Sequence, residues 1–129
     1  MILEGFGIFV DDMAAMIRFY RDVMGFAIQE PENTENVYLV KDGVLFLLYS
    51  KQDFEKMTGQ RFDYIHGLNG HYEIAMKVGN YGEVDSVFAD VTARGAKPVM
   101  PPTTMPWGQR TCYVADPEGN LIEIGSFQP

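Results

Sequence analysis

The segment PWGQRTCYVADPEGNLIEI, residues 106–124, has the pattern of a tight β-hairpin. β-Branched, aromatic and other apolar residues favour a strand over Arg110–Ala115. Asp116–Gly119 combines aspartate, proline and glycine, which is typical of a turn. A second strand is expected over Asn120–Gly125, where apolar residues alternate around Glu123. The hairpin therefore places Glu123 on one face and two isoleucines on the other.

The residues before this hairpin predict a strand, a helix and a further strand. Glu73–Val78 alternates in the manner of a strand, and Asn80 is a suitable N-cap for the helix that follows. The apolar side chains of that helix recur at helical spacing, at Val84, Val87, Phe88 and Val91. Gly95 is expected to end the helix, and a strand over Lys97–Met100 is expected to end at the two prolines that follow it. Residues 70–129 thus predict a βαβββ module.

Residues 1–50 predict the same order of elements. A strand is expected over Gly5–Val10, and Asp11 or Asp12 can cap the next helix. The apolar face of that helix consists of Met13, Met16, Ile17, Tyr20 and Met24. Gly25 is expected to end the helix. Three further strands are expected over Phe26–Glu30, Asn36–Val40 and Val44–Tyr49.

Corresponding positions in the two halves keep a nearly constant spacing. Val78 follows Val10 by 68 residues, the two helix-ending glycines are 70 apart, and Gly119 follows Gly43 by 76. The spacing grows only at the loops, as expected of a duplicated module with loops of unequal length. We therefore expect an α+β fold in which two tandem βαβββ modules form a cupped mixed sheet with helices on the outer face.

The length of the chain, 129 residues, suits one domain. We expect a single domain over residues 1–129, with module one at 1–50, a linker at 51–69 and module two at 70–129. A short helical turn is expected within the linker, at Asp53–Met57.

Composition excludes several functional classes. The net charge of −8 and the isoelectric point of about 4.6 disfavour binding to the phosphate backbone of nucleic acids. The one cysteine, Cys112, excludes an internal disulfide and favours a buried, inert thiol. The sequence has no signal-peptide pattern, and its apolar runs are too short to span a bilayer. We therefore expect a cytoplasmic protein with neither nucleic acid nor membrane as a partner.

Strand alternation assigns two glutamates to the inner face of the predicted sheet. Glu73 and Glu123 face inward, and His71 shares the face of Glu73. The repeat aligns Glu73 with Gly5 and Glu123 with Leu47. Carboxylates are rarely buried without a partner, so the pair indicates a metal, a cationic ligand, a shared proton or nearby donors. Solvation at a sheet edge, or an ion pair with an arginine such as Arg110, is the simpler alternative for each.

Residues 106–124 resemble the final strands of the glyoxalase / bleomycin-resistance / extradiol-dioxygenase superfamily, which has the vicinal oxygen chelate fold. In that family an Asp-Pro-x-Gly-Asn turn leads into a strand with a hydrophobic–Glu–hydrophobic triplet. The segment FVDDMAAMIRFYRDVMGF, residues 9–26, is similar to the first helix of the family. The resemblance covers nearly the whole chain except the linker. It implies two βαβββ modules around a small-molecule site, and a homodimer.

In metal-using members of this family, a divalent ion takes its ligands from four equivalent inner positions. The resemblance implies Glu73 and Glu123 as two of them, whereas Gly5 and Leu47 offer no donor. Catalytic sites commonly keep three protein ligands, so we expect no metal and no other cofactor. A divalent metal stays possible, with His71 as the third ligand.

The departure from the metal-binding pattern places the chain nearest to the metal-free, bleomycin-resistance-like branch. We expect metal-independent sequestration of a drug-like or metabolite ligand in an apolar cup, as in antibiotic resistance. Trp107 would stack on the ligand, and Arg110 would steer an anionic group or hold one of the two glutamates. The candidate ligand-binding residues are Phe9, Leu47, Tyr49, His71, Glu73, Trp107, Arg110 and Glu123.

Two enzymatic alternatives stay open. A metal-dependent glyoxalase-type lyase, isomerase or dioxygenase would use Glu73, Glu123 and His71 as metal ligands and a glutamate to shuttle the proton. A metal-free enzyme would use Glu73 or Glu123 as a general base. The sequence does not name the substrate or ligand of either.

Overall fold

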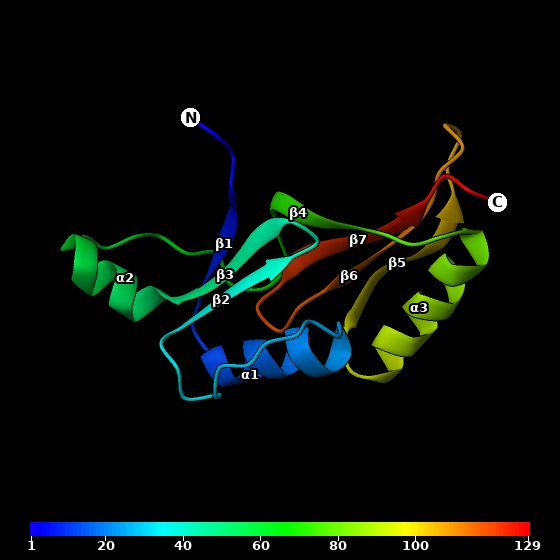
Figure 1. Ribbon diagram of the computed structural model, residues 1–129. Helices are drawn as coiled ribbons and strands as arrows, with labels where there is room; N and C mark the ends of the chain where they lie inside the picture. The colour runs from blue at the N-terminus through cyan, green and yellow to red at the C-terminus, as the bar shows by residue number, and fades with distance from the viewer. The chain divides into compact units, whose positions relative to one another are not determined.

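Short strands and helices follow one another in two repeats of a similar order (Figure 1). The computed structural model describes residues 1–129, which form two compact units, unit 1 at Met1–Tyr64 and unit 2 at Ile65–Pro129. The strands are β1 (Gly5–Val10), β2 (Asn36–Lys41), β3 (Val44–Ser50), β4 (Asn69–Lys77), β5 (Lys97–Thr104), β6 (Arg110–Ala115) and β7 (Asn120–Ser126). The helices are α1 (Met13–Arg18), the π-helical turn η1 (Phe19–Val23), α2 (Lys51–Thr58) and α3 (Tyr81–Ala93). None of the helices has the length and apolar character needed to cross a membrane.

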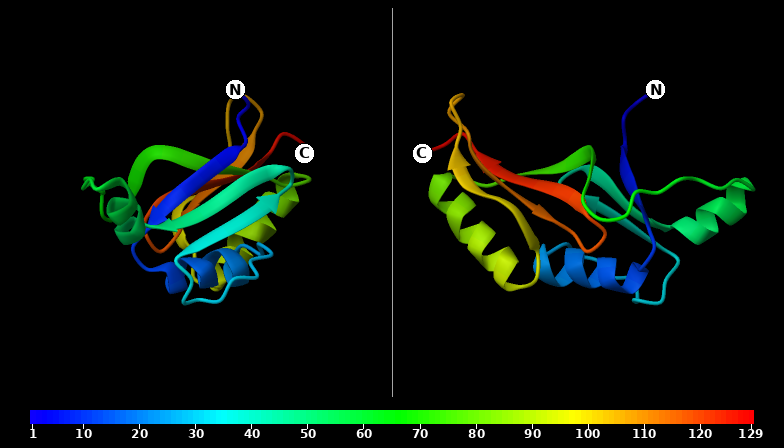
Figure 2. Two further views of the ribbon diagram at one scale, coloured as in Figure 1. Left: turned by 60° about the vertical axis from the view of Figure 1, so that its left-hand side comes forward. Right: turned by 180° about the vertical axis from the view of Figure 1, so that it is seen from behind.

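The sheet of unit 1 has three strands in the order β1-β3-β2, with β1 parallel and β2 antiparallel to β3. The carboxylate of Asp12 accepts a hydrogen bond from the Ala15 N–H and caps α1. The helix lies along one face of the sheet (Figure 1, Figure 2). There the ring of Tyr20 lies 4.9 Å from that of Phe46, and Leu48 is fully buried. These contacts form the core of unit 1.

The opposite face of this sheet is covered in part by α2. The ring of Phe54 lies 4.3 Å from that of Phe9 and 5.9 Å from that of Tyr49. Ser50 caps α2 through the Asp53 N–H, and Gly59, in the left-handed conformation, ends it. Residues expected to form a linker thus contain a helix of eight residues that packs on the sheet of unit 1.

The expected strand over Phe26–Glu30 does not form. The Phe26 N–H bonds to the Tyr20 carbonyl, and the Ile28 N–H bonds to the Phe26 carbonyl, so both donors are used locally. Phe26 and Ile28 are buried, which explains the strand-like alternation without a strand. At the free edge of β2, the Glu30 carboxylate accepts the Tyr38 N–H at 2.7 Å in place of a neighbouring strand. Unit 1 therefore has one strand fewer than expected.

The sheet of unit 2 has four strands in the order β4-β7-β6-β5, with β4 parallel to β7 and the other pairs antiparallel. Helix α3 begins at Asn80, whose side chain accepts the Glu83 N–H, as the sequence predicts. It covers one face of the sheet (Figure 2). The largest fully buried side chains of unit 2 come from that helix and from the sheet: Val84, Cys112, Val114, Ile122, Ile124 and Ser126.

Strand β5 continues past its expected end. Pro101 and Pro102 lie inside it, and the strand ends at Thr104. It is an edge strand, and its register with β6 shifts between Pro98 and Met100 and again between Met100 and Thr103. Prolines are tolerated at edges and at such irregularities because no ladder hydrogen bond is lost there.

Strand pairing confirms the register of the internal repeat. Gly5 pairs with Leu45 across β1 and β3, and Glu73 pairs with Leu121 across β4 and β7. Glu73 follows Gly5 by 68 residues, and Leu121 follows Leu45 by 76, the two spacings that the sequence predicts. The two units therefore repeat one pattern of strand pairing.

Candidate functional site

One face of the sheet in unit 2 is not covered by α3, and we call it the helix-free face. Ala75, Glu123 and Tyr113 lie side by side across β4, β7 and β6. Glu73 lies two residues before Ala75 and therefore shares this face. Two residues further along the strands, Lys77 pairs with Gly125, which also pairs with Thr111. The helix-free face consists of Glu73, Ala75, Lys77, Thr111, Tyr113, Leu121, Glu123 and Gly125.

The turn between β6 and β7 sets this register. Asp116, which is 3% exposed, accepts hydrogen bonds from the backbone N–H groups of Glu118 and Asn120 and from the Asn120 side chain. Gly119 adopts a positive φ of 87° and packs against Gly67. Because the turn residues are fixed in this way, Glu123 stands opposite Tyr113.

Glu123 is held by neutral donors. The Gln109 amide and the Thr111 hydroxyl each donate to Oε1 of Glu123, at 2.9 Å in both cases. The Gln109 amide lies over Gly125, where an added Cβ would be 2.8 Å from Nε2. Glycine at this position thus gives the amide room to reach the carboxylate. Oε2 of Glu123 accepts no hydrogen bond from the protein.

Tyr113 lies near both glutamates. Its hydroxyl interacts with the Glu73 carboxylate and lies in the field of Glu123. Burial, the interaction with Glu73 and the nearby negative charges, in that order, raise the pKa of Tyr113. Tyr113 therefore stays a protonated donor at neutral pH. The cluster consists of two carboxylates with neutral partners and no cation within ion-pair distance.

Trp107 lies in the connection between β5 and β6, which projects past the end of the sheet (Figure 2). The Met105 N–H bonds to the Gln109 carbonyl at 2.7 Å and closes this turn. The indole of Trp107 is 61% exposed, and its N–H donates to Oε1 of Gln109 at 3.0 Å. A chain of hydrogen bonds therefore runs from Trp107 through Gln109 to Glu123.

Arg110 lies on the other face of the sheet. Its guanidinium binds Asp85 of α3 at 2.6 Å and Thr104 at 3.0 Å. The expectation that Arg110 holds Glu73 or Glu123 is therefore wrong. Strand alternation explains the difference, because Arg110 has the parity of the buried Cys112. The thiol of Cys112 is fully buried and its pKa is raised to about 11 by burial, so it is not a nucleophile at neutral pH.

The other sequence-predicted residues belong to unit 1 or to the start of β4. Phe9, Leu47 and Tyr49 belong to unit 1, where Phe9 and Tyr49 pack around Phe54. His71 lies exposed on β4, where the ladder register shifts between Asn69 and Glu73, so simple alternation does not place it beside Glu73.

A pocket of about 180 Å³ opens beside Glu123 on unit 2. Gln109 and Lys77 line it together with Gly125 and the exposed ring of Phe127. The chain gathers no group of three or more His, Cys, Asp or Glu side chains that could hold a metal ion. The donor set within unit 2 thus does not fit the divalent site that the family resemblance implies.

Sequence reasoning missed three residues of the site, Gln109, Thr111 and Tyr113. A signal for two of them was present, because the hairpin register places Tyr113 opposite Glu123 and Thr111 two residues before it. Gln109 could not be found in this way, since its contact depends on the space above Gly125.

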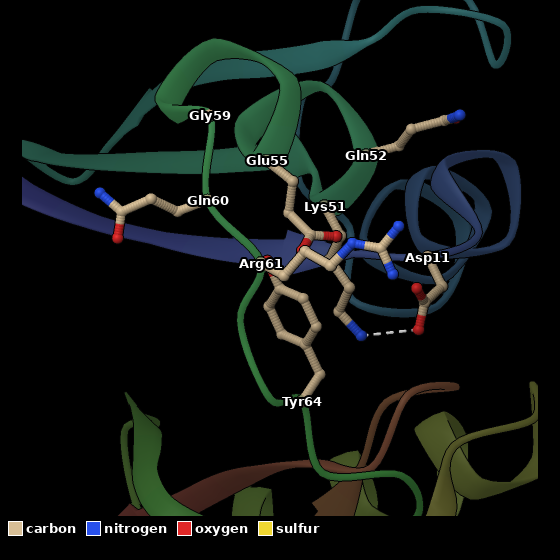
Figure 3. A pocket seen from close by; sticks show the side chains of 8 residues that line it. All are labelled: Asp11, Lys51, Gln52, Glu55, Gly59, Gln60, Arg61 and Tyr64. Carbon is tan, nitrogen blue, oxygen red and sulfur yellow. Dashed lines mark hydrogen bonds and ion pairs between the residues drawn. The ribbon is translucent and has the colours of Figure 1, made fainter.

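A second, larger pocket lies wholly in unit 1 (Figure 3). It has a volume of about 540 Å³ beside the first turns of α2. Lys51 forms an ion pair with Asp11 at 2.6 Å, and its ammonium lies 4.6 Å from the centre of the Tyr64 ring. Arg61 and Glu55 complete a balanced set of two positive and two negative side chains around the pocket.

A known protein family and a bacterial protein are similar to this chain over most of its length. The Glyoxalase/Bleomycin resistance protein/Dioxygenase superfamily model matches residues 2–124. The uncharacterized protein YraH of Bacillus subtilis (strain 168) is 27% identical over 118 residues, which cover 89% of this chain and 90% of that protein.

Two solved structures illustrate the likeness. A glyoxalase/bleomycin resistance protein/dioxygenase from Nocardioides is 20% identical with a TM-score of 0.84, and the match covers 99% of this chain and 84% of that one. A lactoylglutathione lyase from Agrobacterium tumefaciens is 25% identical with a TM-score of 0.73, covering 96% and 92%. Because the family model matches residues 2–124, the chain belongs to the Glyoxalase/Bleomycin resistance protein/Dioxygenase superfamily.

Proposed function

We propose that this protein binds a small molecule without a metal, through a cationic group of the ligand that contacts Glu123. The observation that carries the proposal is the hydrogen bonding of Glu123. Two neutral donors orient Oε1, while Oε2 accepts no bond from the protein and the carboxylate lines a pocket. An oriented carboxylate without a cationic partner is a suitable acceptor for an ammonium group.

Trp107 and Tyr113 support the same function. Trp107 is an exposed aromatic side chain whose indole N–H is tied to Gln109, so the ring is held beside the site. An aromatic face attracts both flat and cationic ligands. Tyr113 and Glu73 add a second carboxylate and a donor on the same face, which increases the negative potential around the pocket.

The experiment is calorimetric titration of the full chain with benzylamine, with benzyl alcohol as the neutral control. We expect the amine to bind and the alcohol to bind at least tenfold more weakly. Glu123→Gln keeps the size of the side chain and removes its charge, so it should weaken amine binding by about 10–100-fold. Glu35→Gln, an exposed charge of unit 1, is the matched control and should change nothing. Equal binding by Glu123→Gln and the parent chain would refute the proposed site.

A metal-dependent lyase is the second candidate, and similarity to the lactoylglutathione lyase is the observation that favours it. Its ligands would include Glu73 and Glu123. Elemental analysis of protein purified without chelator, followed by titration with nickel, zinc, manganese and iron(II), separates the two functions. Stoichiometric metal that is lost in both Glu73→Gln and Glu123→Gln would replace the binding function by the enzymatic one. We expect no such binding.

A further inference from the structure

Lys77 is the one basic residue that lines the pocket beside Glu123. It pairs with Gly125 across β4 and β7, while Glu123 pairs with Ala75 one step earlier. Lys77 and Glu123 are therefore diagonal neighbours on the helix-free face. A strand spacing of about 4.8 Å and a rise of about 3.3 Å per residue place their Cα atoms roughly 8 Å apart.

The two side chains do not pair with each other. Glu123 is turned toward Gln109 and Thr111, and Lys77 is exposed and forms no ion pair. An exposed ion pair between them would contribute little to stability, and the hydrogen bonds to Oε1 outweigh it. The hydrogen bonds to Oε1 hold the Glu123 carboxylate away from the Lys77 ammonium. The pocket is therefore lined by one positive and one negative side chain that do not neutralise each other.

The rest of the pocket is small and partly apolar. Gly125 and Ala75 form its floor between the two charges, and the ring of Phe127, 59% exposed, stands at its side. A large exposed aromatic next to a pocket offers packing area to an apolar group. The volume of about 180 Å³ is enough to hold a small molecule.

We infer that the pocket binds a small zwitterion, a compound that carries an ammonium, a carboxylate and a short apolar side chain on one carbon. The ammonium would donate to Glu123, the carboxylate would accept from Lys77, and the side chain would pack on Phe127. This inference rests on the proposed function, since it assigns the cationic group to the same glutamate, and it adds the anionic group and the residue that recognises it.

Three probes separate the two charges. L-Leucine has both, its methyl ester has only the ammonium, and N-acetyl-L-leucine has only the carboxylate. In calorimetric titration we expect leucine to bind about tenfold more tightly than the ester, and the acetylated compound to bind most weakly. An ester that binds as tightly as leucine would overturn the inference.

Variants of Lys77 complete the test. Lys77→Met should weaken leucine binding by about tenfold and leave the ester unchanged, while Lys77→Arg should keep most of the leucine affinity. Lys56→Met, an exposed lysine on α2, is the matched control. Unchanged leucine affinity in Lys77→Met would overturn the zwitterion inference alone. Unchanged affinity for both leucine and the ester in Glu123→Gln would overturn the proposed function and the inference together. Thermal unfolding of each variant confirms that it is folded.

Discussion

The two units of this protein pair their strands in the same register but place different side chains at the equivalent positions. Gly5 corresponds to Glu73, and Leu47 corresponds to Glu123. Tyr38 pairs with Leu47 in unit 1 as Tyr113 pairs with Glu123 in unit 2. The scaffold is therefore repeated, whereas the polar cluster occurs only in unit 2.

The backbone packing around Gly5 and the exposure of Tyr38 distinguish unit 1 from unit 2 at these positions. A Cβ added to Gly5 would collide with the backbone oxygen and the Cβ of Leu45, so unit 1 cannot accept an acidic side chain where unit 2 has Glu73. Tyr38 is 59% exposed, while Tyr113 is partly buried and interacts with Glu73. At the Gly5 position the difference between the units is therefore enforced by the Leu45 backbone, whereas at the Leu47 position it is a difference of side chain.

The largest expected effect concerns the equivalent turn glycines Gly43 and Gly119. Both have positive φ, so alanine at either should cost about 1–2 kcal/mol of folding free energy. At Gly119 the new Cβ would also strike the backbone of Gly67, which adds about 1–3 kcal/mol, whereas nothing lies near Gly43. Urea unfolding of Gly119→Ala and Gly43→Ala measures the difference. Equal costs would show that the turn of unit 2 is not packed as described.

Gly5 and Gly7 offer the next comparison, within β1. Gly5→Ala should destabilise the protein by about 1–3 kcal/mol, because the obstacle is the Leu45 backbone. Gly7→Ala should cost less, since its nearest neighbour is the Leu47 side chain at 3.2 Å, which can shift. Urea unfolding of the two variants decides the order. A Gly5→Ala variant as stable as the parent chain would mean that a side chain, such as a carboxylate, fits at position 5 of unit 1.

The two equivalent tyrosines should differ by a smaller amount. Tyr113→Phe removes a partly buried hydroxyl that interacts with Glu73 and should cost about 1 kcal/mol. Tyr38→Phe removes a hydroxyl from an exposed side chain and should cost close to nothing. Thermal or urea unfolding compares them. If both were neutral, Tyr113 would not contribute to the cluster in the way described.

The smallest effect is a change in titration. Burial raises the pKa of Tyr113 most, and the interaction with the Glu73 carboxylate raises it further, so Glu73→Gln should lower that pKa and let the tyrosinate form at lower pH. Ultraviolet absorbance of tyrosinate, with Tyr113→Phe subtracted to isolate this residue among seven tyrosines, follows the titration. A pKa that rises or stays constant would contradict the interaction between the two side chains.

Much of the fold could be predicted from the sequence because local signals and tertiary packing agree. The bounds of β1 and β6, the cap at Asn80 and the spacing of the repeat were predictable from alternation and turn chemistry. The strand over Phe26–Glu30 was not, because burial of alternate residues imitates a strand even where no partner strand exists. The end of β5 was missed because an irregular edge strand tolerates proline.

The candidate site was predictable only in part. Alternation placed Glu123 on the helix-free face, with Tyr113 and Thr111 within reach of the same argument. The positive charge of Arg110 suggests a partner for the two glutamates. Its place in the alternation of β6 points it to the opposite face, where it pairs with Asp85. The contact between Gln109 and Glu123 depends on three-dimensional packing over Gly125, for which the sequence carries no local signal.

The most direct test is two-dimensional NMR of the labelled full chain during titration with benzylamine. We expect chemical-shift changes confined to unit 2, around residues 73–77, 107–113 and 121–127, and in Glu123→Gln we expect the same changes only at about 10–100-fold higher amine concentration. Shift changes centred on residues 1–64, or none at all at high amine concentration, would contradict the claim that unit 2 alone carries the binding site.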